Sequence, residues 1–271
     1  MYLHDAAYAG DSELVRYMLM AGADPEFRDG VGDTPLVKAV ARDQTKTVHV
    51  LLEFGTDVVS LIPKMKRTAL HVAAVHNSIN AMQVLLSSGA DVHCRDRDGF
   101  TPLHTAAIDG RTEAAQLLLE VGAEVNARSQ RGYTPLYMTA INGKSDTADL
   151  LLKSGATVNV EDNNGWIPLY EAVAFGHLTT LLRLLETGSD QGICSMVGLS
   201  DSLCEVLDDR TPTGDTILHI AAKFGHIHLV EILLAHGANS RAKNSEGKTP
   251  GELASQSGHH YVAIRLQMAS P

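Results

Sequence analysis

Histidine is the residue type in this chain that most suggests chemistry, because 13 of the 271 residues are histidine. Imidazole rings titrate near neutral pH and bind metal ions. His226, His228 and His236 lie close together in the sequence, but residues two apart on a helix point to different sides of it. We therefore expect no metal site there. Most of the other histidines recur at fixed places in a repeated pattern, which favours a structural role.

The three cysteines, Cys94, Cys194 and Cys204, could supply nucleophiles or metal ligands. Their number is odd and none has CxxC or CxxH spacing, which suits a reducing compartment better than a disulfide framework or a zinc site. Cys204 has no base at motif spacing, and no GxSxG turn or phosphate-binding glycine loop occurs. We expect no enzymatic activity, no cofactor and no metal.

Composition narrows the class of partner. The net charge of -10 argues against nucleic acid, whose binders gather Lys and Arg. The first twenty residues do not form a signal peptide, and no run of 18 apolar residues suggests a membrane helix. We expect an unsecreted protein of the cytoplasm or nucleus that does not bind membranes.

The chain repeats itself with a period near 33 residues. Seven segments align, among them "RTALHVAA", "FTPLHTAA" and "YTPLYMTA", and their threonine (once isoleucine) slots fall at 34, 68, 101, 134, 167, 216 and 249. A glycine follows each of the first six slots by 21 residues. This regularity predicts a stack of similar units.

Each unit is predicted to contain two helices and a projecting loop. In the clearest unit, Thr101 can cap a helix and Pro102 suits its first turn. The alanines at 106 and 107 allow close helix packing, Gly110 separates the two helices, and Gly122 ends the second one. The polar segment before the next threonine slot, often containing "DG", is typical of a hairpin-like turn.

These units resemble the ankyrin repeat family, whose T-P-L-H-x-A signature appears as "TPLHTAA" at 101–107. The resemblance implies an all-α ankyrin-repeat solenoid of helix-turn-helix units with projecting β-hairpin-like loops. About eight units are expected, with an insertion at about 191–210; their approximate ranges are 1–28, 29–62, 63–95, 96–128, 129–161, 162–190, 211–243 and 244–271.

The resemblance also gives most histidines a structural role. The histidine of the signature is a hydrogen-bonding residue in such units, and this slot holds His4, His71, His104 and His219. Three more follow the glycine of the turn between helices: His177, His226 and His259.

Recognition is expected in the positions that the repeat leaves free. The residue before the threonine slot is aromatic in three successive units, at Phe100, Tyr133 and Trp166. We call these three residues the aromatic row. Further candidate partner-binding residues are Ile108, Ile141, Phe175 and Phe224 after the alanine pair, and the polar loop residues Arg97, Arg131 and Asn163. Aromatic anchors among polar groups favour a protein interface, although the rings could equally pack on one another and stiffen the array.

Two departures from the pattern, and one match to it, leave alternatives open. The loop at 57–67 has the sequence "DVVSLIPKMKR", an apolar run followed by basic residues, where the other loops are polar. It suggests either a functional loop or a degenerate one packed against its neighbour. The insertion at 191–210 is either a partner-facing elaboration or a spacer. Asn126 and Asn159 match the asparagine that certain oxygenases hydroxylate in ankyrin-like repeats, but each also suits an unmodified turn.

The sequence therefore predicts a monomeric, non-enzymatic protein that binds another protein or a peptide through its loop tips and concave face. The alternative is a regulatory or targeting segment of a larger protein, such as a channel, a ubiquitin-ligase adaptor or an ankyrin-bearing enzyme. The start of the chain at the first helix of a unit favours this alternative.

Overall fold

The computed structural model describes residues 3–188 and 206–269. It forms two compact units that divide between Pro135 and Leu136. The described residues contain 16 helices and no strand, with one isolated antiparallel bridge between Ile62 and Arg67. This confirms the predicted all-α fold and shows that the projecting loops are closed turns without a continuous β-ladder.

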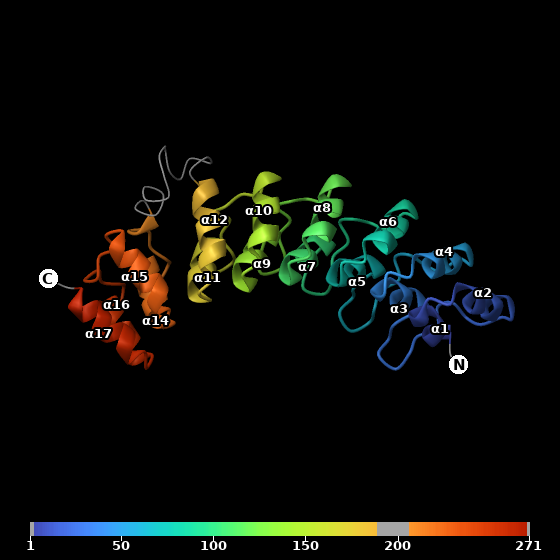
Figure 1. Ribbon diagram of the computed structural model, residues 1–271, viewed down its shortest axis with the longest axis horizontal. Coiled ribbons are helices and arrows are strands. Elements are labelled where there is room, and N and C mark those ends of the chain that lie inside the picture. Colours follow the sequence, from blue (N-terminus) through green and yellow to red (C-terminus); the bar gives the residue numbers. More distant parts are fainter. Residues whose placement is uncertain (1–2, 189–205, 270–271) are drawn as a thin grey trace. The chain divides into compact units, whose positions relative to one another are not determined.

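The first unit holds four helix pairs (Figure 1). The first helices of the pairs contact one another in sequence; they are α1 (Leu3–Ala9), α3 (Pro35–Ala41), α5 (Ala69–His76) and α7 (Pro102–Asp109). The second helices form a matching row made of α2 (Ser12–Met20), α4 (Thr45–Glu53), α6 (Ile79–Ser87) and α8 (Thr112–Glu120). Each pair thus buries its apolar side against the next pair, as stacked repeats do.

The second unit repeats this arrangement. Its helices are α9 (Pro135–Asn142), α10 (Ser145–Lys153), α11 (Pro168–Ala174), α12 (Leu178–Gly188), α14 (Ile217–Lys223), α15 (Ile227–Ala235), α16 (Pro250–Gln256) and α17 (His260–Met268). Helix α14 packs against both α11 and α16, so the stack continues across the long connection between α12 and α14.

Small residues let the helices approach closely. Ala106 and Ala107 of α7 are fully buried, as are Ala73 and Ala74 of α5. Larger side chains, such as the fully buried Leu103, fill the remaining space. Each buried leucine contributes roughly 1.5–3 kcal/mol. The alanine pairs thus set the helix spacing that brings the loops of neighbouring repeats together.

The threonine slots begin the helices, as predicted. Thr101 has extended backbone angles, and its hydroxyl accepts the backbone N–H of His104 at 3.4 Å. Pro102 is the first residue of α7, and Gly110 ends that helix with φ +69°. Gly122 has φ +93° after α8. The local chemistry of one repeat therefore fixes where its first helix begins and where both of its helices end.

The irregular loop at 57–67 is hydrogen-bonded on both sides. Ser60 accepts from Arg28 of the preceding loop at 2.8 Å, and the Met65 carbonyl accepts from the Arg97 N–H of the following loop at 2.8 Å. These bonds pack the loop against its neighbours, as the second alternative expects, and leave Lys64 and Lys66 exposed. Lys66 takes a left-handed conformation, φ +53°, where the equivalent Gly99 and Gly132 have φ +81° and +82°.

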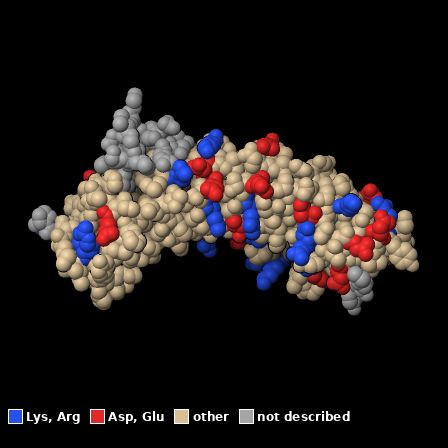
Figure 2. All heavy atoms as spheres, in the orientation of Figure 1, with Lys and Arg blue, Asp and Glu red and all other residues tan. Residues whose placement is uncertain are grey.

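Most of the predicted insertion at 191–210 lies outside the described residues, as do Cys194 and Cys204. At its described end, Val206 and Leu207 are buried. On the face seen in Figure 2, basic and acidic side chains are interspersed among residues of other types, which make up most of the surface. No helix among the described residues has the length and apolar character needed to cross a bilayer.

Candidate functional site

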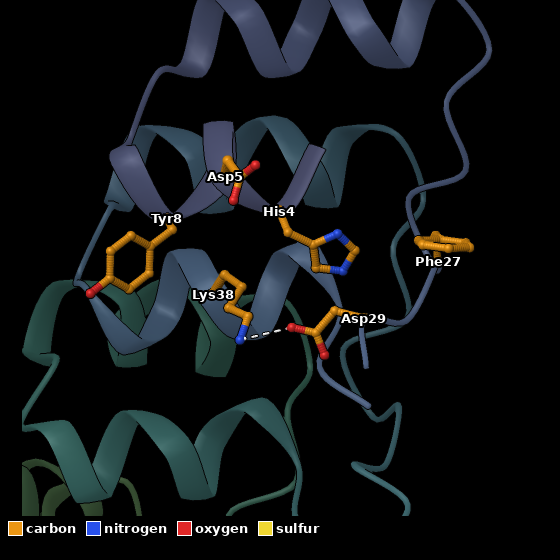
Figure 3. Close-up of a pocket in the computed structure, with 6 residues that line it drawn as sticks. All are labelled: His4, Asp5, Tyr8, Phe27, Asp29 and Lys38. Atoms are coloured by element: carbon orange, nitrogen blue, oxygen red, sulfur yellow. Dashed lines mark ion pairs between the residues drawn. The ribbon is translucent and has the colours of Figure 1, made fainter. Parts of the chain in front are cut away.

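One cavity in the first unit lies at its N-terminal end (Figure 3). It measures about 440 Å³ and is lined by His4, Asp5 and Tyr8 of α1, Lys38 of α3, and Phe27 and Asp29 of the loop between the first two repeats. No sequence pattern indicates this cavity, apart from an aromatic residue in an otherwise polar loop.

The lysine of this N-terminal cavity is already paired within the protein. Lys38 Nζ lies 2.9 Å from Asp29 and 2.8 Å from Asp33. Although burial raises the pKa of the Asp29 carboxyl, hydrogen bonds from Lys38 and from the backbone N–H groups of Asp33 and Val31 lower it to about 2. The Lys38 ammonium and the Asp29 carboxylate of this cavity are therefore engaged with each other.

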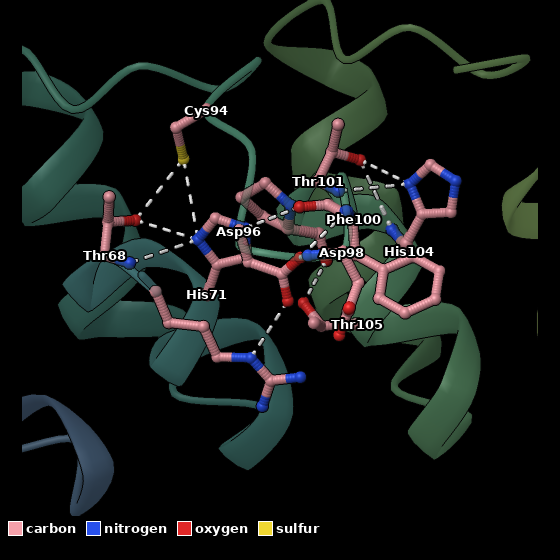
Figure 4. A network of polar contacts seen from close by, with 11 residues as sticks. Thr68, His71, Cys94, Asp96, Asp98, Phe100, Thr101, His104 and Thr105 are labelled. Atoms are coloured by element: carbon pink, nitrogen blue, oxygen red, sulfur yellow. Dashed lines mark hydrogen bonds and ion pairs between the residues drawn. The ribbon is translucent and has the colours of Figure 1, made fainter. Parts of the chain in front are cut away.

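The buried signature histidines also hold fixed structural hydrogen bonds (Figure 4). The backbone N–H of Thr101 points at His104 Nδ1, at 3.2 Å, so this nitrogen must accept and carry no proton. His104 Nε2 therefore bears the hydrogen and donates to the Tyr133 carbonyl at 2.9 Å. The same pairs of bonds hold His71, between Thr68 and Phe100, and His219, between Thr216 and Lys248.

This geometry requires neutral rings. Burial lowers the pKa of His71 and of His219, and it lowers the pKa of His104 to about 4. A ring that is neutral and has both nitrogens engaged at pH 7 has no proton to exchange with a substrate. The prediction that these histidines are structural hydrogen-bonding residues is confirmed.

Cys94 lies beside one of these rings. Its Sγ is 3.6 Å from His71 Nδ1 and 3.3 Å from the Thr68 hydroxyl. A catalytic cysteine–histidine pair needs a thiol pKa that is lowered toward neutrality. Here burial raises the pKa of the Cys94 thiol to about 11, and burial also lowers the pKa of His71. The pair therefore has the electrostatics of a packed core rather than of an active nucleophile.

The histidines of the helix–helix turns are structural as well. His177 Nε2 bonds to the Ile141 carbonyl at 3.0 Å, and His226 Nε2 bonds to the Ala174 carbonyl at 2.7 Å. His177 lies so close to Gly143 that a Cβ added there would approach the ring to 2.6 Å. Within the described ranges, no three His, Cys, Asp or Glu side chains are grouped in a way that could hold a metal ion.

The loop tips of the first unit are joined into a rigid edge. Asp96 is buried and closes its own loop by accepting the N–H groups of Asp98 and Phe100, both at 2.9 Å. The next loop is joined to this one because the Gln130 N–H donates to the Asp98 carbonyl at 3.0 Å. The Gln130 side chain also donates to the Arg97 carbonyl at 2.9 Å. Backbone bonds thus fix the tips while leaving several side chains outside.

A second cavity, of about 260 Å³, opens on this edge. It is lined by Asp98, Phe100, Ser129, Gln130, Arg131 and Tyr133. The structure therefore brings together Phe100 and Tyr133 of the aromatic row with Arg131, as one surface feature. Ser129 and Gln130 were not predicted, although they occupy in their loop the places of Asp96 and Arg97 one repeat earlier. We call this feature the Phe100–Tyr133 pocket.

The rings of the row are half-buried rather than fully exposed. Phe100 packs on the ring of His104, with centroids 5.4 Å apart, and in the second unit Trp166 meets Tyr170 edge-on at 6.1 Å. Each of these two rings therefore packs on the residue four positions later, where the signature has its histidine. This contact within a repeat supports part of the packing alternative, while the remaining exposed surface of Phe100 and Tyr133 lines the pocket.

The other candidate residues differ in exposure. Phe175 and Phe224 are 54% and 44% exposed, and their rings stack on His177 and His226 in the second unit. The remaining candidates divide into half-buried Ile108 and Ile141 and exposed Arg97, Arg131 and Asn163. The two exposed phenylalanines thus lie at the ends of the neighbouring helices α11 and α14.

Comparison with known families agrees with this architecture. The model of ankyrin repeats in three copies matches residues 3–96, 103–194 and 193–269. The chain belongs to the ankyrin repeat family. Ankyrin repeats are in general non-catalytic modules for protein–protein interaction, and the stacked helix pairs of this ankyrin-repeat chain have the architecture on which such binding surfaces are built.

Similar segments occur in proteins of several kinds. One of 101 residues is 35% identical to tyrosine-protein kinase HTK16 of Hydra vulgaris, and one of 99 residues is 34% identical to NF-kappa-B inhibitor alpha of Homo sapiens. A third, of 101 residues, is 37% identical to E3 ubiquitin-protein ligase KEG of Arabidopsis thaliana. They cover 37%, 35% and 36% of the ankyrin-repeat chain, but only 13%, 31% and 6% of these relatives.

Proposed function

We propose that this chain is a non-enzymatic binding protein that holds a segment of another protein at the Phe100–Tyr133 pocket and along the adjoining loop tips. The observation that carries the proposal is that two aromatic side chains of successive repeats line one cavity together with a carboxylate and a guanidinium. Aromatic anchors in a pocket with a polar rim are the arrangement that dominates binding energy in protein interfaces.

The pocket is preorganised, which supports binding without refolding. The Phe100 and Tyr133 carbonyls accept hydrogen bonds from His71 and His104, at 2.9 Å each. The Phe100 backbone N–H is held by Asp96. Binding then costs little conformational entropy on the side of the repeat protein, because the loops that carry the anchors are already fixed.

The test is a double replacement of the anchors. Phe100→Ala with Tyr133→Ala removes the walls of the pocket, while the backbone bonds of the loops do not need either side chain. We expect a partner that binds the unaltered chain to bind the double variant about tenfold or more weakly, since each anchor contributes roughly 1–2 kcal/mol of binding free energy. Far-ultraviolet circular dichroism should show unchanged helicity.

A matched control removes exposed aromatic rings elsewhere. Phe175→Ala with Phe224→Ala deletes two rings of the second unit and should leave binding at the pocket intact. A partner that binds the Phe100/Tyr133 variant as tightly as the unaltered chain would exclude the pocket as its site.

A second candidate function is that of a regulatory or targeting segment within a larger protein. It is supported by the relatives, which include a kinase and a ubiquitin-protein ligase whose matched segments are a small part of their length. The mass of the native protein, measured by immunoblot with an antibody to residues of this chain, tests this candidate. A native mass equal to 29.0 kDa would refute it.

A further inference from the structure

The loop tips of the first unit are strongly basic in a protein whose net charge is -10. Residues 64–67, 95–98 and 128–131, which we call the fingertip strip, contain seven Lys or Arg and two Asp. One of the two, Asp96, is buried and paired with Arg67 at 3.3 Å. Only Asp98 then opposes the exposed cations. Figure 2 shows basic side chains projecting from the lower edge of the molecule.

The strip is continuous in space. The Arg97 N–H donates to the Met65 carbonyl at 2.8 Å, and the Gln130 N–H donates to the Asp98 carbonyl at 3.0 Å, so the three tips are successive neighbours. Lys64, Lys66, Arg97 and Arg131 are exposed and form no ion pair with any described residue. Their charges are therefore available to a ligand.

The neighbouring end of the same unit has the opposite character. Residues 3–42 contain seven Asp or Glu and four Lys or Arg. A polyanion long enough to extend past the strip toward these residues would meet repulsion, whereas a short acidic segment confined to three loop tips would not. The charge pattern thus limits the length of the ligand as well as its sign.

We propose that the fingertip strip binds an acidic peptide segment whose apolar side chain enters the Phe100–Tyr133 pocket. This inference rests on the proposed function and specifies its partner. Packed helices lie about 8–10 Å apart. A peptide in the polyproline II conformation has three residues per turn and rises about 3.1 Å per residue, so residues three apart lie on one side of it and reach successive tips. The matching segment carries Asp or Glu at i, i+3 and i+6, with an apolar residue beside one of them.

The pocket favours a peptide over a single-stranded nucleic acid. Phe100 is half-buried against His104, so its ring does not stand out as a stacking platform for bases. The pocket also includes the Asp98 carboxylate, which can accept a backbone N–H, a group that a peptide has and a sugar-phosphate backbone lacks.

Peptide display tests the proposal because it requires no partner to be chosen in advance. A random dodecamer phage library is selected on the immobilised full chain, and the enriched peptides are synthesised with a fluorophore. Their affinities are measured by anisotropy at low and high salt, together with that of an oligothymidylate. Arg97→Glu with Arg131→Glu is the test variant; Lys46→Glu with Lys153→Glu, at exposed positions away from the strip, is a control with the same net charge.

We expect enriched peptides with acidic residues at three-residue spacing, whose affinity falls with salt and falls about tenfold or more in the test variant but not in the control. Peptides that need Phe100 and Tyr133 but show no acidic enrichment would overturn the inference and leave the proposed function standing. Acidic peptides that bind the Phe100→Ala, Tyr133→Ala variant unchanged would overturn the proposed function. Failure to enrich any peptide, or tighter binding of the oligothymidylate, would also overturn the inference.

Discussion

The buried ring of His104 makes the stability of the array depend on pH. Its pKa is about 4 in the folded protein and about 6.5 in an unfolded chain. Between these two values the unfolded chain binds more protons, so the free energy of unfolding falls as the pH falls. At 1.36 kcal/mol per pKa unit, this one ring removes about 2 kcal/mol of stability between pH 8 and pH 5.

The variant His104→Gln isolates this contribution. Glutamine at the third helical position can accept the Thr101 N–H as the imidazole does, but it does not titrate. Urea unfolding followed by circular dichroism at pH 8 and pH 5 should show that the original chain loses about 2 kcal/mol more than the variant. His93→Gln, which removes an exposed histidine from a loop, controls for the loss of a ring as such.

Repeat arrays can unfold in more than one step, so the ring is also observed directly. The Cε1 proton of His104, assigned by its absence from the variant spectrum, should shift with a midpoint near pH 4 while the fold is intact. Nitrogen shifts at neutral pH should report a proton on Nε2. A midpoint near 6.5 in folded protein, or parallel stability curves for the two chains, would refute the assignment of His104 as a neutral capping residue.

Three further predictions concern packing and reactivity. Gly99→Ala should lower the free energy of unfolding by about 2 kcal/mol in urea titrations, because φ is +81° and the new Cβ would lie 2.9 Å from the Gln130 nitrogen; an unchanged midpoint would contradict this. Tyr137→Phe should lower the free energy of unfolding by about 1 kcal/mol and raise the pKa of the Glu171 carboxyl further, because the tyrosine hydroxyl donates to that carboxyl at 2.8 Å. The change in pKa is measured by following the chemical shift of the Glu171 carboxyl carbon against pH. Cys94, in a chain whose other cysteines are serine, should react slowly with iodoacetamide at pH 8 and faster after unfolding, and equal rates would exclude the raised thiol pKa.

The sequence predicted well the features that depend on residues close together in the chain. Thr101, Pro102 and His104 act within one helical turn, so their spacing alone indicates a capped helix. The alanine pairs are informative for a similar reason, because only small side chains fit where a helix packs tightly on both sides.

The features that depend on how one repeat meets the next were not predictable from spacing. Cys94 reaches His71 only because its loop folds back over α5, 23 residues away. The Phe100–Tyr133 pocket forms where Gln130 is hydrogen-bonded to the preceding loop. The sequence of a single repeat does not indicate that bond. The half-burial of Phe100 likewise follows from its packing on His104.

The hydrogen bond from each signature histidine has an evolutionary consequence. Its acceptor is the backbone carbonyl of the residue before the next threonine slot, and the residue there is Asp33, Phe100, Tyr133 or Lys248. The repeat thus fixes this position through a backbone carbonyl, which every amino acid has. This bond survives a change in the charge, size or polarity of the side chain there, so new binding preferences can arise by single substitutions that leave the bond intact.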